Sequence, residues 1–206
     1  MSHHHRTNQR KRVAQEAAGM LYTGQEKEYK QAKLRAAKIL GVRVLPSNAE
    51  VAMELNRIAE EREGKTRQER LVQMRGEALQ IMRVLRNFGP ILVGSVWRGT
   101  AHRNSDIDIA TYAKNPQEIV STLQKNKYPI KRTEIQTVTK KGKKGQSFHI
   151  YVDFPSNNHA EIVVRSPEDI SCQVRCEIYG DIVTGSTIKQ LLRVLEDNPK
   201  QKFLPT

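Results

Sequence analysis

The sequence predicts an α/β (α+β) fold, in which a small mixed β-sheet is flanked by helices and preceded by an all-helical extension. Two observations carry this prediction. The first 88 residues hold repeated helix-start signals and apolar residues three and four positions apart, which are typical of amphipathic helices. From residue 91 onward, short stretches alternate β-branched and polar residues, as strands with one buried face do. At 206 residues, the chain is long enough to bury a hydrophobic core.

Four helices are expected before the sheet, over residues 10–20, 24–40, 48–62 and 67–88. Three capping-box patterns mark helix starts, at Thr23-Gly-Gln-Glu26, Ser47-Asn-Ala-Glu50 and Thr66-Arg-Gln-Glu69, and Gly41 and Gly64 suit helix ends. The last helix has one apolar stripe, formed by Leu71, Met74, Ala78, Ile81, Leu85 and Phe88. We expect this stripe to pack against the sheet, with a dimerising coiled coil as the alternative.

The predicted organisation has three parts. Residues 1–12 form a basic tail that is expected to be disordered, residues 13–88 form the helical N-terminal region, and residues 89–206 form the domain that holds the sheet. The helical region either presents substrate or serves as a scaffold, and the sequence does not separate these two roles.

The most informative stretch runs from Gly94 to Ile109. A Gly-Ser pair, Gly94-Ser95, follows the apolar run 91–93, and the chain returns as Asp106-Ile107-Asp108-Ile109. This order predicts a strand, a turn, a short helix and a second strand. Alternation in the second strand places Asp106 and Asp108 on one face. Two neighbouring carboxylates repel each other, so a bound cation is expected, and oxygen ligands at a phosphate-handling site favour Mg²⁺.

The residues upstream of the acidic pair suit phosphate binding. Gly94 allows a ligand to approach the backbone closely. Ser95 and the amides after it stand at the expected start of the short helix, where N–H groups face outward. Phosphate contacts and metal-binding carboxylates are therefore expected at neighbouring strand ends.

The spacing apolar-Gly-Ser, ten residues, Asp-apolar-Asp-apolar resembles the signature of the polymerase-β-type nucleotidyltransferase superfamily. Within it, Arg98-Gly99-Thr100 and Ser105-Asp106 resemble the CCA-adding enzymes and the minimal nucleotidyltransferases. The resemblance covers about residues 88–165. It implies a metal-dependent enzyme that transfers a nucleoside monophosphate from a nucleoside triphosphate, ATP for instance, to an acceptor hydroxyl.

The resemblance also implies roles for single residues. Asp106 and Asp108 would hold two Mg²⁺ ions, with Mn²⁺ as an alternative, while Gly94 and Ser95 would contact the β and γ phosphates. Arg98 would neutralise charge on the leaving pyrophosphate. A third carboxylate is expected from a neighbouring strand, and there are two candidates, Glu161 and Asp153. We favour Glu161, because an acid followed by an apolar run after a hairpin is how the CCA-adding relatives place theirs.

The remaining elements follow from local signals. Asn115-Pro116 should start a helix, residues 130–138, 148–154 and 160–164 should be strands, and residues 186–196 should form a terminal helix. Residues 140–145, rich in lysine and glycine, are expected to form a loop, either a basic flap beside the site or a solvated hairpin tip.

The formal net charge of +13 is concentrated in two segments. Residues 6–43 hold ten Lys and Arg against three Glu, and residues 125–144 hold eight against one. Such clustering suggests RNA as a partner, bound through its phosphates, although a solubilising surface is the alternative. No apolar run is long enough for a membrane span and no signal peptide is evident, so we expect a cytoplasmic protein without membrane contact.

Three functions stay open at this point. The first is nucleotide transfer to RNA. The second is a minimal nucleotidyltransferase that modifies a protein or belongs to a toxin-antitoxin pair. The third is a nucleic-acid-binding protein without catalysis. A protein partner or a homo-oligomer is compatible with all three.

Overall fold

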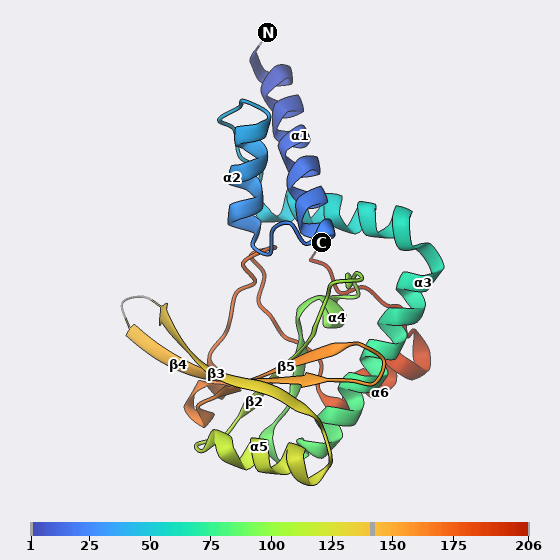
Figure 1. Cartoon of the computed structure of the whole chain (residues 1–206), viewed down its shortest axis with the longest axis vertical. Helices are drawn as coiled ribbons and strands as arrows, with labels where there is room; N and C mark the ends of the chain where they lie inside the picture. The colour runs from blue at the N-terminus through green and yellow to red at the C-terminus, as the bar shows by residue number, and fades with distance from the viewer. Residues whose placement is uncertain (1, 141–142, 206) are drawn as a thin grey trace.

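The computed structural model describes residues 2–140 and 143–205 of the chain (Figure 1). Its helices are α1 (Ser2–Thr23), α2 (Tyr29–Ile39), α3 (Asn48–Val84), α4 (Gly94–Arg98), α5 (Pro116–Lys125) and α6 (Ile188–Asp197). Two short 3₁₀ turns, η1 (Arg86–Phe88) and η2 (Pro167–Ser171), join them. The strands are β1 (Ile91–Val93), β2 (Ile107–Tyr112), β3 (Ile130–Lys140), β4 (Lys143–Asp153) and β5 (His159–Arg165). The predicted fold class, a mixed sheet with flanking helices, is confirmed.

The five strands form one sheet in the order β1-β2-β5-β4-β3. Strands β2 and β5 are parallel, and the other neighbours are antiparallel. One face of the sheet is buried, because Ile107 and Ile109 of β2 and Ile162 and Val164 of β5 lie in a cluster with residues of α3, α5 and α6. Asp108 of β2 and Glu161 and Val163 of β5 lie at the alternate positions, are only partly covered, and belong to the open face. Alternation thus places the acids on the open face, as period two requires.

Helix α3 bends at Gly64, which divides it into two arms. Gly64 has φ 49° and ψ −124°, a backbone conformation that L side chains rarely adopt. The first arm, residues 48–63, packs with α1 and α2 in a separate hydrophobic cluster that includes Val13 and Leu55. The second arm, residues 65–84, lies along the sheet (Figure 1). The apolar stripe from Leu71 to Leu85 is in the sheet core, so its expected packing is confirmed. Helix α3 therefore contributes to two hydrophobic clusters, one on each side of Gly64.

Three of the predicted helix starts are confirmed. Ser47 caps α3, since its hydroxyl accepts from the Glu50 amide and Glu50 Oε2 accepts from the Ser47 amide at 2.6 Å. Asn115 likewise caps α5 through the Gln117 amide, at 3.1 Å. Residues 186–196 hold the terminal helix α6, which Thr187 caps.

Two of the capping boxes are wrong. Thr23 is the last residue of α1, and its hydroxyl donates to the Gly19 carbonyl at 2.9 Å. Gly24, with φ 76°, ends that helix, and α2 begins five residues later at Tyr29. Thr66 lies inside α3, because the interruption falls at Gly64.

The N-terminal residues differ from the expected disordered tail. Helix α1 begins at Ser2, so residues 2–12 are helical. Arg10 pairs with Glu50 of α3 at 2.7 Å, and Val13 of α1 is fully buried in the cluster that α1 forms with α2 and α3. These contacts fasten the helix to the first arm of α3.

The strands predicted downstream are confirmed, but the loop at residues 140–145 is shorter than expected. Strands β3 and β4 stay paired out to Lys140 and Lys143. Residues 141 and 142, at the tip of the expected flap, lie outside the described residues. Within residues 2–140 and 143–205, no helix combines the length and the apolar character that a membrane crossing requires.

Candidate functional site

The Gly94-Ser95 turn lies directly against Asp108. Strand β1 ends at Val93, which is the antiparallel partner of Asp108, and α4 starts at the next residue. Gly94 has φ 70°, and a Cβ atom built there would collide with Asp108 Oδ2. Glycine is therefore required at position 94 both by the backbone conformation and by the carboxylate. The predicted strand, short helix and second strand are present, but no separate turn precedes the helix, because Gly94 and Ser95 are its first two residues.

Asp106 and Asp108 are carboxylates without partners in the chain. Across residues 2–140 and 143–205, neither side chain accepts a hydrogen bond or forms an ion pair. Burial, together with the nearby charges of Glu161 and Asp106, raises the pKa of Asp108 to about 7. The pKa of Asp106 is also raised, mainly by burial, although His159 and Lys27 oppose the shift. The pair thus carries an electrostatic cost that a bound cation would relieve.

Glu161 lies on β5, next to Asp108, as the parallel register of the two strands requires. On its other side, Tyr151 of β4 is its antiparallel partner. His149 Nδ1 lies 2.6 Å from Glu161 Oε1, and the Tyr151 hydroxyl lies 2.8 Å from the same oxygen. Glu161 Oε1 is therefore held by two groups, while no described residue binds Oε2.

A polar network extends from Glu161 over the open face of the sheet. The Ser147 hydroxyl lies 2.7 Å from His149 Nε2, so both ring nitrogens of His149 are engaged. The Tyr151 hydroxyl also lies 2.7 Å from Glu134 Oε1, and its single proton can bind only one of the two carboxylates at a time. Burial and these two hydrogen bonds raise the pKa of Tyr151, which keeps it a neutral donor.

Asp153, the other candidate for the third carboxylate, is already compensated. His159 Nδ1 lies 2.6 Å from one carboxylate oxygen, and Lys131 Nζ lies 3.4 Å from the other. The hydrogen bond from His159 and the charge of Lys131 lower the pKa of Asp153. Asp153 and Glu161 therefore differ in surroundings, since only Glu161 is the direct cross-strand neighbour of Asp108.

The carboxylates of the open face determine which divalent ion the site can hold. Among the described residues, no group of three or more His, Cys, Asp and Glu side chains is arranged to hold a metal, so Glu161 does not complete a cluster with the two aspartates. Mg²⁺, however, usually takes one or two carboxylates and fills its remaining positions with water and substrate phosphates. Asp106 and Asp108 fit that requirement, because both carboxylates are free of other partners.

Arg98 has a different partner from the expected pyrophosphate. Its side chain is buried and donates to both oxygens of Asp181, at 2.7 and 3.0 Å, and to the Phe203 carbonyl at 3.0 Å. The guanidinium also lies over the rings of Trp97 and Tyr179, at 4.7 and 4.9 Å from their centroids. The charge of Arg98 is thus neutralised within the chain.

Two buried arginines of α3, which the sequence analysis did not single out, fix the motif in place. Arg75 is fully buried and donates to the carbonyls of Val96 and Trp97 in α4, at 3.1 and 2.9 Å, and burial lowers its pKa to about 10. Arg67 donates to the carbonyls of Thr100 and Ala101, at 3.0 and 2.7 Å. Arg75 directly follows Met74, a residue of the apolar stripe. A charged residue beside a buried position of the helix is the feature of the sequence that could have indicated a buried arginine.

The two basic segments lie on different parts of the molecule. Segment 6–43 covers α1 and α2, at one end of Figure 1, and segment 125–144 runs from the end of α5 into the β3–β4 hairpin, which projects from the sheet. Some of these charges are paired, as Arg10 is with Glu50 and Arg35 is with Glu26.

A family described only as a domain of unknown function, DUF4269, matches residues 76–167, from the second arm of α3 to just beyond β5. No curated protein matches the chain.

Several solved structures share part of the arrangement. A structure of Cid1, described for its RNA terminal uridylyl transferase activity, is 13% identical over 47% of this chain and 30% of that chain, with a TM-score of 0.34. Cid1 with the UTP analogue UMPNPP is 15% identical over 54% and 36%, with a TM-score of 0.33. The GLD-2/RNP-8 complex is 18% identical over 60% and 44%, with a TM-score of 0.34. The chain spans less than half the length of each of these three proteins.

Proposed function

We propose that the protein is a metal-dependent nucleotidyltransferase, which transfers a nucleoside monophosphate from a nucleoside triphosphate to an acceptor hydroxyl. One observation carries the proposal. Asp106 and Asp108 form a carboxylate pair directly beside the Gly94-Ser95 turn, neither side chain has a hydrogen-bond or ion-pair partner among the described residues, and the pKa of Asp108 is raised to about 7. A pair in this state is suited to a cation that arrives with a phosphate ligand.

Asp106 and Asp108 would hold Mg²⁺, or Mn²⁺ in its place. When bound, two such ions would supply charge neutralisation for the triphosphate and activation of the acceptor hydroxyl. Because Gly94 has no side chain, the Asp108 carboxylate lies directly against the Gly94-Ser95 turn. Phosphates bound at this turn would therefore adjoin Asp108, and the Ser95 hydroxyl, which makes no hydrogen bond with the described residues, would donate to them.

Glu161 would orient the acceptor hydroxyl or take its proton through Oε2. The hydrogen bonds to Oε1 from His149 and Tyr151 fix the direction of the carboxylate, so that Oε2 is the oxygen left for this role. Arg98 is not assigned a part in the reaction, since Asp181 neutralises it.

We further propose RNA as the acceptor, held by segments 6–43 and 125–144. The support is their charge, ten basic against three acidic residues in the first and eight against one in the second. Binding through phosphates releases counterions, so the affinity should fall steeply between about 50 and 200 mM salt. A protein acceptor, and a purely nucleic-acid-binding role, are the outcomes that the following experiment separates from it.

The test is incubation with each labelled nucleoside triphosphate and Mg²⁺, with pooled RNA or protein as the acceptor. The Asp106→Asn, Asp108→Asn double variant should lose transfer. The matched control is Asp153→Asn, which removes a carboxylate of the same face that the chain already compensates, and it should retain transfer. Equal activity in the wild type and the double variant would contradict the proposal, as would the absence of both transfer and Mg²⁺-dependent triphosphate binding.

A further inference from the structure

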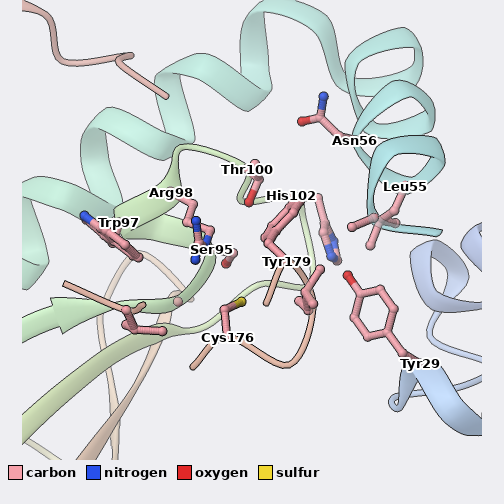
Figure 2. A pocket seen from close by; sticks show the side chains of 14 residues that line it. Tyr29, Leu55, Asn56, Ser95, Trp97, Arg98, Thr100, His102, Cys176 and Tyr179 are labelled. Atoms are coloured by element: carbon pink, nitrogen blue, oxygen red, sulfur yellow. The ribbon is translucent and has the colours of Figure 1, made fainter. Parts of the chain in front are cut away.

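A pocket of about 150 Å³ lies at the junction of the N-terminal helices and the sheet domain (Figure 2). Its walls come from four parts of the chain. Tyr29 belongs to α2, Leu55 to the first arm of α3, Ser95 to α4 and Tyr179 to the segment that follows β5. The Asn48 side chain ties this last segment to α3 by donating to the Glu177 carbonyl at 2.9 Å. The pocket therefore exists only because the helical extension is packed against the motif.

Four hydroxyl groups of the pocket lining have no hydrogen-bond partner among the described residues. Among residues 2–140 and 143–205, the hydroxyls of Tyr29, Ser95, Thr100 and Tyr179 make no hydrogen bond with another group. Figure 2 shows these side chains converging with His102 on one space, the hydroxyl of Tyr29 toward the His102 ring. A mostly apolar pocket with a few convergent polar groups is the usual form of a small-molecule site.

The interior of the pocket is electrically neutral. Arg98 is the single Lys or Arg among the described residues that line it, and Asp181 neutralises Arg98 at 2.7 Å. Burial lowers the pKa of His102, so its ring is uncharged at neutral pH. Because His102 Nδ1 accepts from the Asn104 amide at 3.2 Å, the neutral ring carries its proton on Nε2 and offers it as a donor. Such surroundings suit an uncharged ring with hydrogen-bonding edges and are unfavourable for phosphate.

The pocket is continuous with the candidate site. Gly94 and Ser95, which adjoin Asp108, are also part of its lining. Pockets that enclose a whole drug-sized ligand have volumes of about 300–1,000 Å³. This pocket is smaller, so it suits a single ring system. A nucleotide with its phosphates beside Gly94 and Asp108 has such a ring to place nearby.

We infer that this pocket is the subsite for the base of the donor nucleotide, and that it selects among nucleobases. The inference rests on the proposed function. The rings of Tyr29 and Tyr179 supply apolar contact to the base, and the hydroxyls of Tyr29 and Thr100, together with His102 Nε2, read its polar edge. The helical extension thus contributes to substrate selection.

The experiment compares the binding of a nucleoside triphosphate with that of inorganic tripolyphosphate, both with Mg²⁺, by calorimetry. Leu55→Trp fills the pocket, and Met53→Trp, on the same arm but 68% exposed, is the control. Leu55→Trp should weaken nucleotide binding by at least about tenfold, the contribution of one stacked base, and leave tripolyphosphate binding unchanged. Met53→Trp should change neither.

A second variant guards against misfolding of the first. Tyr29→Phe removes one oxygen atom and should change the order of preference among the four nucleoside triphosphates, with tripolyphosphate binding unchanged. The inference is overturned if Leu55→Trp leaves nucleotide binding intact, if it weakens both ligands equally, or if Tyr29→Phe leaves the order unaltered. Failure of the proposed function is recognised separately, because Asp108→Asn would then leave the binding of both ligands unaffected.

Discussion

The carboxylate of Asp108 occupies the space that a side chain on Gly94 would need. The two residues belong to adjacent strand ends, where Val93 and Asp108 are paired, so the contact is set by the register of β1 and β2. The positions of the Gly94-Ser95 turn and of the Asp108 carboxylate are thus fixed by the same strand pairing.

Gly94→Ala should therefore destabilise the protein and abolish activity. The substitution combines a strained φ of +70° with a collision at Asp108. Gly41→Ala is the matched control, because Gly41 has φ +64° and an added Cβ would meet nothing within 4 Å. We expect about 1–2 kcal/mol of lost stability for Gly41→Ala and more for Gly94→Ala, measured by urea unfolding. Equal losses would show that the Asp108 contact costs nothing.

Asp108→Asn should stabilise the metal-free protein at neutral pH. The pKa of Asp108 in the folded state, about 7, lies above its ordinary value of 3.8, so the folded state holds the proton more tightly. Stability is then lost as pH rises from about 4 to 7, and the loss is complete above 7. The full shift corresponds to about 4 kcal/mol, and partial exposure of the group reduces the expected gain to about 1–3 kcal/mol.

Unfolding in a chelating buffer at pH 5 and pH 8 checks this. The advantage of Asp108→Asn over the wild type should be larger at pH 8. An advantage that is the same at both values, or a loss of stability at pH 8, would contradict the raised pKa.

Mg²⁺ should stabilise the wild type more at pH 8 than at pH 6. The ion competes with the proton on Asp108, so binding is strongest where that proton is already lost. The midpoint of thermal unfolding, measured with and without Mg²⁺, should rise in the wild type and in Asp153→Asn, and stay constant in Asp108→Asn. A rise of equal size in all three would place the ion elsewhere.

His149→Ala should lower kcat by about ten- to a hundredfold, with the KM for nucleotide nearly unchanged, because Glu161 loses a group that fixes its direction. His149→Gln keeps a donor and should lose less. Ser147→Ala, which removes only the far partner of His149, should lose least. Steady-state kinetics of the three variants would give kcat and KM separately. A change confined to KM would mean that His149 acts on nucleotide binding and not on the chemical step.

Arg75→Met should unfold the protein readily. It leaves the carbonyls of Val96, Trp97, Pro199 and Gln201 without their buried donor. We expect a loss of about 3 kcal/mol or more in urea unfolding. Arg57→Met, which breaks only exposed pairs with Glu54 and Glu61, should cost less than about 1 kcal/mol.

The parts of the site that sequence reasoning reached depend on local rules. Side chains along a strand alternate between its two faces, which places Asp106 and Asp108 on one face. The capping box, a hydroxyl residue three positions before an acid, correctly predicted that Ser47 caps α3. The Thr23 box failed because Gly24 ends α1 first, a competition between two local signals that the pattern does not rank.

The other parts depend on partners far away in the chain. Arg98 meets Asp181, 83 residues later, and Arg75 binds carbonyls more than 120 residues beyond it. The pocket near Ser95 needs Tyr29, Leu55 and Tyr179 together. Short sequence patterns do not encode such long-range contacts, because the contacts form only when separate helices, strands and loops pack together.

The hydrogen bonds from Arg75 and Arg98 to residues 199–203 have a consequence for folding during synthesis on the ribosome. Arg75 binds the carbonyls of Pro199 and Gln201, and Arg98 binds that of Phe203. When all five strands have left the ribosome, these three carbonyl acceptors are still missing. The guanidinium groups of Arg75 and Arg98 then lack part of their hydrogen bonds. The segment around the Gly-Ser turn can therefore reach its final rigidity only after translation has passed residue 203.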